Sequence, residues 1–150
     1  MEFAFIVPLL FLILFGIIDY GLYINDSLSA RQGVREAARQ GVVGNWGDST
    51  DCGSDQLARL SCTAKERIGP ITGDAYVKVS APEGWDVGSP LTVCALVHVE
   101  GVIGLVPMPD YITTRVDMSI ERIEPPAPGS DPHEDPLPSS LPGSPTWEWC

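Results

Sequence analysis

The opening of the chain, MEFAFIVPLLFLILFGIIDYGLY (residues 1–23), decides the fold. One carboxylate, Glu2, is followed by an uncharged, largely apolar run from Phe3 to Ile18. As a helix rising about 1.5 Å per residue, this run covers about 24 Å, and continuing it through Tyr23 completes a bilayer crossing. No Lys or Arg precedes the run, although secretory signals and ordinary anchors usually carry basic residues. The pattern predicts a transmembrane helix over residues 1–24 with an unusual acidic start.

Three residues inside this helix have particular consequences. Pro8 removes one helical hydrogen bond, so we expect a local kink or a melted turn beside it. Gly16 and Gly21 are tolerated in a membrane helix and permit the close approach of a second helix.

The helix is predicted to continue as an amphipathic segment to about Val42 and to end near Gly44. A stripe of small residues recurs at helical spacing, and a basic ridge follows at intervals of four. The ridge is either a solvated face or a surface that pairs with acidic groups of the body or of a neighbouring subunit. The stripe comprises Ala30, Gly33, Ala37 and Gly41, and the ridge comprises Arg31, Arg35 and Arg39.

Residues 25–123 are predicted to form a small α+β body. Ser54 or Asp55 caps a second, shorter helix that Gly69 closes. Alternating or β-branched patterns predict three strands, which should form an antiparallel sheet on the second half of the long helix. The strands are AYVKVS (75–80), LTVCALVHVE (91–100) and ITTRVDMSIERI (112–123).

The composition changes abruptly at residues 124–150, which hold eight of the fourteen prolines. Such a composition predicts an extended, polyproline-like tail. A simple spacer would not need to end in Trp147, Trp149 and Cys150. We therefore expect the end of the tail to dock, either on its own body or on a neighbouring subunit.

The four cysteines follow the membrane segment, which favours disulfides in an oxidising, extracytoplasmic compartment. If the second helix starts near Ser54, Cys62 lies about 12 Å along its axis, whereas bonded cysteines have Cα atoms within about 7 Å. Pairing Cys52 with Cys62 is therefore the least attractive choice, and we favour Cys62 with Cys94 and Cys52 with Cys150. Whether Cys150 bonds within or between subunits stays open.

Charge and side-chain chemistry indicate a protein that is not an enzyme. The net charge of −11 and the pI of about 4.3 disfavour binding to a phosphate backbone, so nucleic acid is not an expected partner. His98 lies in a strand pattern and His133 in the tail, and neither accompanies a recognisable nucleophile or phosphate loop. We expect no catalytic residues, no metal site and no cofactor.

The apolar opening, followed by ARQGVREAARQGVV (residues 30–43), resembles the TadE-like proteins of bacterial tight-adherence pili, which are similar to type IV pilins. The resemblance covers roughly the first 43 residues, while the cysteines and the Pro-rich tail lie outside it. The residues that carry it are Glu2, Phe3, Pro8, Phe15 to Ile18, Asp19, Tyr20, Gly21, Arg35, Ala37, Ala38 and Arg39.

The resemblance implies a pilin-like structural subunit of a tight-adherence pilus, assembled by lateral packing of its N-terminal helix and acting in surface adhesion. The alternatives are a minor pseudopilin that initiates assembly and a permanently anchored extracytoplasmic binding module. The residues expected to pack in the assembly are Glu2, Phe3, Pro8, Gly16, Asp19, Gly21, Gly33 and Ala37.

The implied partners are copies of the chain or related pilins, a prepilin peptidase and a pilus assembly platform. The implied location is the inner membrane, with an extracytoplasmic body, and then the extracellular pilus. Pilins usually carry their glutamate at the fifth mature position, whereas Glu2 stands second, so either the processing or the mature start differs. Glu2 either neutralises the terminal amine of a neighbour in a packed core or is a simple polar residue at the membrane face.

Overall fold

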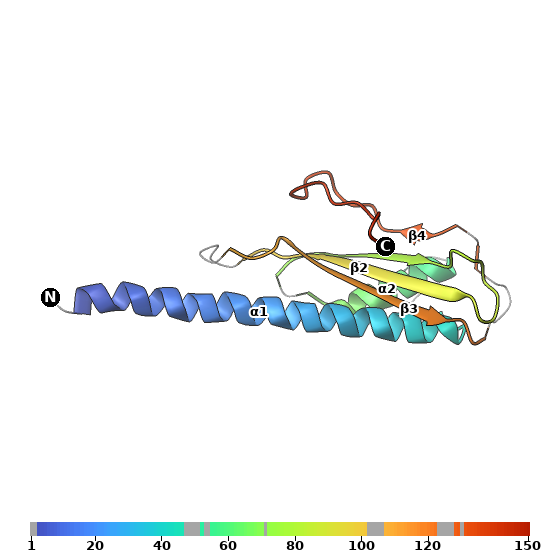
Figure 1. The fold of residues 1–150 in the computed structure, drawn as a ribbon, viewed down its shortest axis with the longest axis horizontal. Coiled ribbons are helices and arrows are strands. Elements are labelled where there is room, and N and C mark those ends of the chain that lie inside the picture. The colour runs from blue at the N-terminus through green and yellow to red at the C-terminus, as the bar shows by residue number, and fades with distance from the viewer. Residues whose placement is uncertain are drawn as a thin grey trace.

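The computed structural model describes residues 3–46, 52, 55–70, 72–101, 107–122, 128–129 and 131–150. It contains two helices and a four-stranded sheet, so the predicted α+β class is confirmed (Figure 1). Met1, Glu2, most of the segment between the two predicted helices (residues 44–55) and residues 102–106 lie outside the described residues. The elements are α1 (Phe3–Val42), α2 (Gln56–Ile68), β1 (Ala75–Ser80), β2 (Pro90–His98), β3 (Tyr111–Ser119) and β4 (His133–Glu134).

Helix α1 is a single 40-residue helix, and its N-terminal part projects beyond the rest of the chain (Figure 1). It ends as predicted, since Gly44 has a φ of 73° and its N–H donates to the Gly41 carbonyl at 3.1 Å. A local kink or a melted turn was expected at Pro8, and the melted turn was wrong, because the helix is continuous through this residue. Proline costs only the local bond that its missing N–H would make, and the bonds of the following turns remain.

Helix α2 has the termini that the sequence predicts. The Asp55 carboxylate accepts a hydrogen bond from the Ala58 N–H at 3.1 Å, which caps the first turn. Gly69 adopts a left-handed conformation with a φ of 43°, and its N–H donates to the Lys65 carbonyl at 2.9 Å.

The strands form an antiparallel sheet in the order β3-β2-β1-β4. Strand β2 is central, and its residues Leu91 to Val97 are all buried. Its odd-numbered residues join the core beneath the sheet, whereas Cys94 bonds to Cys150 of the tail on the other face. Because both faces are covered, the apolar run is continuous and does not alternate.

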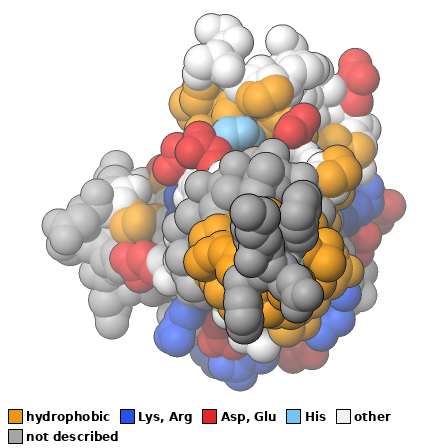
Figure 2. Space-filling view, turned by 90° about the vertical axis from the view of Figure 1, so that its left-hand side faces the viewer, with side chains coloured by type: hydrophobic (Ala, Val, Ile, Leu, Met, Phe, Trp, Pro, Cys, Tyr) orange, Lys and Arg blue, Asp and Glu red, His pale blue; other side chains and the backbone are white. Residues whose placement is uncertain are grey.

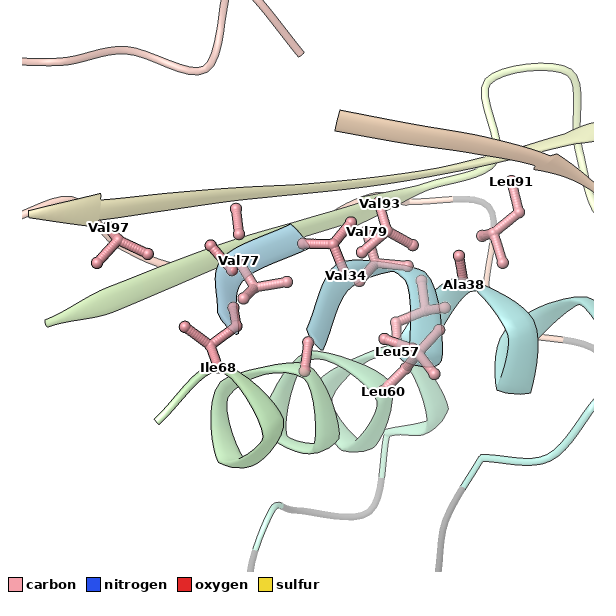
Figure 3. Close-up of a cluster of buried hydrophobic side chains, with 14 of the residues drawn as sticks. Val34, Ala38, Leu57, Leu60, Ile68, Val77, Val79, Leu91, Val93 and Val97 are labelled. Atoms are coloured by element: carbon pink, nitrogen blue, oxygen red, sulfur yellow. The ribbon is translucent and has the colours of Figure 1, made fainter. Parts of the chain in front are cut away.

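The core lies between the sheet and the two helices (Figure 3). Leu60 and Ile68 of α2 meet Val34 of α1 and the odd-numbered valines of β1 and β2. The second half of α1 therefore belongs to the body, as predicted, and most of its first half is uncovered.

Strand β4 was not predicted. Only His133 and Glu134 pair with β1, opposite Val79 and Lys78. A two-residue strand between prolines has no periodicity to detect, so the sequence predicts only an extended tail at these positions.

Candidate assembly surface

The first half of α1 exposes large apolar side chains to solvent in this structure. Ile17 is 67 % exposed and Leu10 is 61 % exposed, and only 6 % of the most apolar stretch of the helix is buried. Figure 2, which faces this end of the molecule, shows hydrophobic side chains around the helix. Among the described residues, α1 is the one helix long and apolar enough to cross a membrane.

A shallow apolar groove runs along this exposed half, and it contains the two glycines that were predicted to allow close packing. A Cβ added at Gly21 would meet nothing within 4 Å, so this side of the helix is open in the single subunit. The groove is lined by Leu12, Ile13, Gly16, Ile17, Tyr20 and Gly21.

The stripe of small residues further along α1 has a different role, because it packs inside the subunit. Ala37 is fully buried. A Cβ added at Gly33 would lie 2.9 Å from the backbone nitrogen of Ile68 and 3.0 Å from the carbonyl oxygen of Ala64. Gly33 thus lets α1 and α2 approach closely, and contact with another subunit stays a prediction for Gly16 and Gly21.

Two aspartates on the body-facing side of α1 have contrasting surroundings. Asp26 accepts hydrogen bonds from the Thr72 N–H at 3.1 Å and the Thr72 hydroxyl at 2.5 Å, which ties the helix to the segment before β1. Asp19 is only 2 % exposed, and no described residue donates a hydrogen bond to its carboxylate. Sequence reasoning singled out Asp19 and missed Asp26, although a spacing of seven residues places both on one helix face.

The basic ridge of α1 is only partly paired. Arg39 forms an ion pair with Glu36 at 3.1 Å. Arg31 and Arg35 are exposed, and neither forms an ion pair with any described residue. In this structure, Arg31 and Arg35 therefore fit the interpretation of the ridge as a solvated face.

The favoured cysteine pairing was wrong. The structure joins Cys52 to Cys62 and Cys94 to Cys150. Although Cys52 precedes Cys62 by ten positions, their Cα atoms lie 5.8 Å apart, so Cys52 lies beside α2. The pairing was predicted wrongly because Cys52 was assumed to lie before the first turn of α2, two turns away from Cys62.

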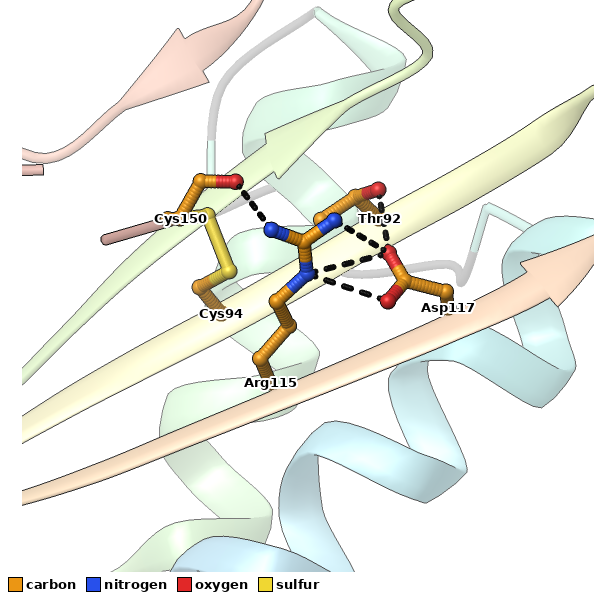
Figure 4. A network of polar contacts seen from close by, with 5 residues as sticks. All are labelled: Thr92, Cys94, Arg115, Asp117 and Cys150. Atoms are coloured by element: carbon orange, nitrogen blue, oxygen red, sulfur yellow. Dashed lines mark hydrogen bonds and ion pairs between the residues drawn. A yellow bond between two sulfur atoms is a disulfide. The ribbon is translucent and has the colours of Figure 1, made fainter. Parts of the chain in front are cut away.

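The end of the tail docks on its own body and forms what we call the strap, residues 131–150. Cys150 bonds to Cys94, and its carbonyl accepts a hydrogen bond from the Arg115 guanidinium at 2.9 Å (Figure 4). The Tyr111 hydroxyl donates to the Pro142 carbonyl, and the Trp147 indole N–H donates to the Asp135 carbonyl at 3.3 Å. Trp147 also packs beside Trp149, with ring centroids 5.8 Å apart.

A buried carboxylate holds the other end of the strap. Asp135 is 7 % exposed and accepts a hydrogen bond from the Val77 N–H at 2.7 Å. Its carboxylate also lies 2.7 Å from the Lys65 ammonium and 3.5 Å from the Ser61 hydroxyl. Sequence reasoning missed this contact, because nothing local distinguishes Asp135 from the other acids of the tail.

Side chains typical of metal sites gather at one place among the described residues, namely Cys52, Cys62 and Glu66. Both sulfur atoms are already bonded to each other, so they are not thiolate ligands. His98 packs against the Tyr111 ring, and His133 lies 3.7 Å from the Asp135 carboxylate.

Acid should lower the stability of the body by protonating Asp117, which lies on the strap side of the sheet. Hydrogen bonds from Arg115 and then from the Thr92 hydroxyl lower the pKa of Asp117 below its ordinary value of 3.8. The stability that Asp117 contributes is therefore complete above pH 3.8 and is lost as the pH falls through its lowered pKa in the folded protein. Unfolding curves of the full chain in detergent at decreasing pH should show a steeper loss for the wild type than for Asp117→Asn. An equal loss of stability with falling pH in both proteins would contradict the contribution of ionised Asp117.

Together, these features define an α+β body on the second half of a long helix whose first half is apolar and largely uncovered, an arrangement that fits membrane anchoring. A family model described as TadE-like protein matches residues 1–39, so the predicted resemblance is confirmed over this segment. The match associates the segment with tight-adherence pili and with a structural family. No curated protein and no solved structure matches the chain.

Proposed function

We propose that the protein is a pilin-like structural subunit of a tight-adherence pilus that assembles by lateral packing of α1. The observation that carries the proposal is the uncovered apolar half of α1, which lies within the family match over residues 1–39. So large an apolar surface is unfavourable in water and needs either lipid or other helices around it.

The division of α1 into two halves supports transfer from a membrane to a filament. The second half is built into the body, so α1 and the body move as one unit. Glycines in the groove of the first half allow close helix packing, which drives helix association where lipid removes the hydrophobic driving force. The inner membrane before assembly, and the surface of a pilus afterwards, are the locations that this function requires.

The two disulfides and the strap support an extracytoplasmic body, since disulfides persist in oxidising compartments. Such a subunit would be processed by a prepilin peptidase, extruded by a pilus assembly platform and surrounded by copies of itself or related pilins. Surface adhesion is the role of the resulting filament.

The groove provides the direct test. The wild-type chain should be abundant in material sheared from the cell surface. Gly16→Leu should reduce its recovery there at least about tenfold, because the added side chain fills the groove that a neighbouring helix would occupy. Ile17→Leu is the matched control, since it conserves side-chain volume in the same groove and should assemble normally.

Quantitative immunoblots of sheared and membrane fractions give the readout, and equal membrane levels exclude a folding defect. A wild-type chain found only in membranes would overturn the proposal. That result would leave an assembly-initiating pseudopilin or an anchored binding module.

A further inference from the structure

We propose that the exposed face of α1 binds a second copy at the acidic end of its body, which is formed by Asp74, Glu100 and Asp110. Arg31 and Arg35 pair with these carboxylates. This inference rests on the proposed lateral self-packing and adds to it a direction, an axial stagger and the charged groups that set them.

A continuous stripe on α1 faces away from the body. Its residues are spaced by three or four, so they align along one side of the helix. The first four are apolar and the last two are basic: Ile17, Tyr20, Ile24, Leu28, Arg31 and Arg35. All six are exposed in the single subunit.

The stripe extends beyond the part of α1 that a bilayer can cover. A crossing needs about 20 residues, so a hydrocarbon core that begins at Phe3 ends near Tyr23. Leu28 lies past this limit and is 52 % exposed, and Ile24 at the boundary is 43 % exposed. The stripe therefore leaves apolar surface above the membrane, next to the two arginines, that a protein partner can cover.

The two arginines stand out on an acidic chain. The net charge is −11. Arg39 and Arg115 are held by Glu36 and Asp117, whereas Arg31 and Arg35 have no ion-pair partner among the described residues. Their charges are available to an acidic partner, and a second copy supplies one.

Three exposed carboxylates form the acidic end of the body. Asp74 lies just before β1, Glu100 just after β2, and Asp110 just before β3. Asp74 accepts a backbone hydrogen bond from His98, and Asp110 accepts one from Val99, each at 2.9 Å, so these segments lie side by side. Glu100 completes the group. Figure 2 shows acidic side chains gathered beside a histidine at this end, and none of the three acids pairs with a described Lys or Arg.

The geometry of one subunit sets the stagger between copies. The acidic end is level with Asp26, whose carboxylate holds Thr72 beside it. Arg31 and Arg35 lie five and nine residues further along α1, or about 8 and 14 Å at 1.5 Å per residue. Two parallel copies offset by about 8–14 Å therefore bring the acidic end of one against Arg31 and Arg35 of the other. The apolar stripe of the second copy then lies beside the exposed apolar half of α1 of the first.

Charge reversal on each surface, and then on both, tests the pairing. Full-length chains in detergent micelles, one labelled with a donor and one with an acceptor fluorophore, report self-association by energy transfer. Arg31→Glu with Arg35→Glu should weaken association at least about tenfold, and so should Asp74→Arg with Asp110→Arg. Combining the two pairs of reversals should restore it to within about threefold of the wild type.

The control is Arg67→Glu, which reverses one charge on α2 away from the stripe and should leave association unchanged. Its matched comparison is Arg31→Glu alone, which makes the same change of charge within the stripe and should weaken association. The proposal is overturned if the combined reversal associates no better than either pair alone, or if Arg67→Glu weakens association equally. The proposed function is read separately in the sheared fraction. If the Arg31/Arg35 variant and the Asp74/Asp110 variant both form filaments normally, only the charge pairing is contradicted. If association depends on these charges but no protein is found in the sheared material, only the filament role is contradicted.

Discussion

Cys150→Ser should lower the free energy of unfolding by about 4 kcal/mol, because the Cys94–Cys150 bond joins residues 56 apart in sequence. A cross-link stabilises a fold chiefly by reducing the conformational freedom of the unfolded chain, and this effect grows with loop length. Removing the Cys52–Cys62 bond, with a separation of 10, should cost less, about 3 kcal/mol. Denaturant unfolding of the full chain in detergent measures both losses.

The same substitution should release the strap locally. Hydrogen exchange should speed up at the Val77 N–H, which donates to Asp135, and at the backbone amide of Asp135 itself, which donates to the Val77 carbonyl at 3.1 Å. Cys94→Ala combined with Cys150→Ser should cost little more than either change alone, since both remove one bond. Unchanged exchange and a loss below about 1 kcal/mol would mean that the non-covalent contacts hold the strap without the disulfide.

Gly33→Ala should destabilise the body by about 1–3 kcal/mol, although alanine is ordinarily the better helix former. The new Cβ would lie within 3.0 Å of backbone atoms of both Ile68 and Ala64, and backbone of a packed helix cannot move aside easily. The helices α1 and α2 would have to separate, which loosens the core beneath the sheet.

Two other glycines of α1 serve as matched comparisons in the same unfolding measurement. Gly41→Ala should cost less, because its Cβ meets the ends of the Leu60 and Leu91 side chains, which can rotate. Gly21→Ala should be neutral or stabilising by up to about 1 kcal/mol, since its Cβ meets nothing within 4 Å. A ranking in which Gly33→Ala and Gly21→Ala behave alike would contradict the close approach of the two helices.

These outcomes separate two roles that one helix combines. Substitutions at Gly33 act on the stability of the subunit, whereas substitutions at Gly16 act on packing between subunits if the proposed function holds. The sequence shows glycines at helical spacing in both halves of α1, and it does not reveal which of them the body covers.

The sequence alone determined the elements whose signals are local. An uncharged run of the right length defined the first half of α1, a capping aspartate and a left-handed glycine bounded α2, and alternation identified β1 and β3. Such signals arise from interactions between residues a few positions apart, so they are present in the chain before it folds.

Only the tertiary structure decided where the tail goes and which cysteines pair. The strap contacts Val77 through Asp135, 58 residues later, and Cys94 through Cys150, 56 residues later. Partners so distant are chosen by the packing of the whole body, which brings the open edge of β1 and the upper face of β2 within reach of the tail. No local pattern encodes that placement, because a buried aspartate and an exposed one look alike in sequence until the fold surrounds one of them.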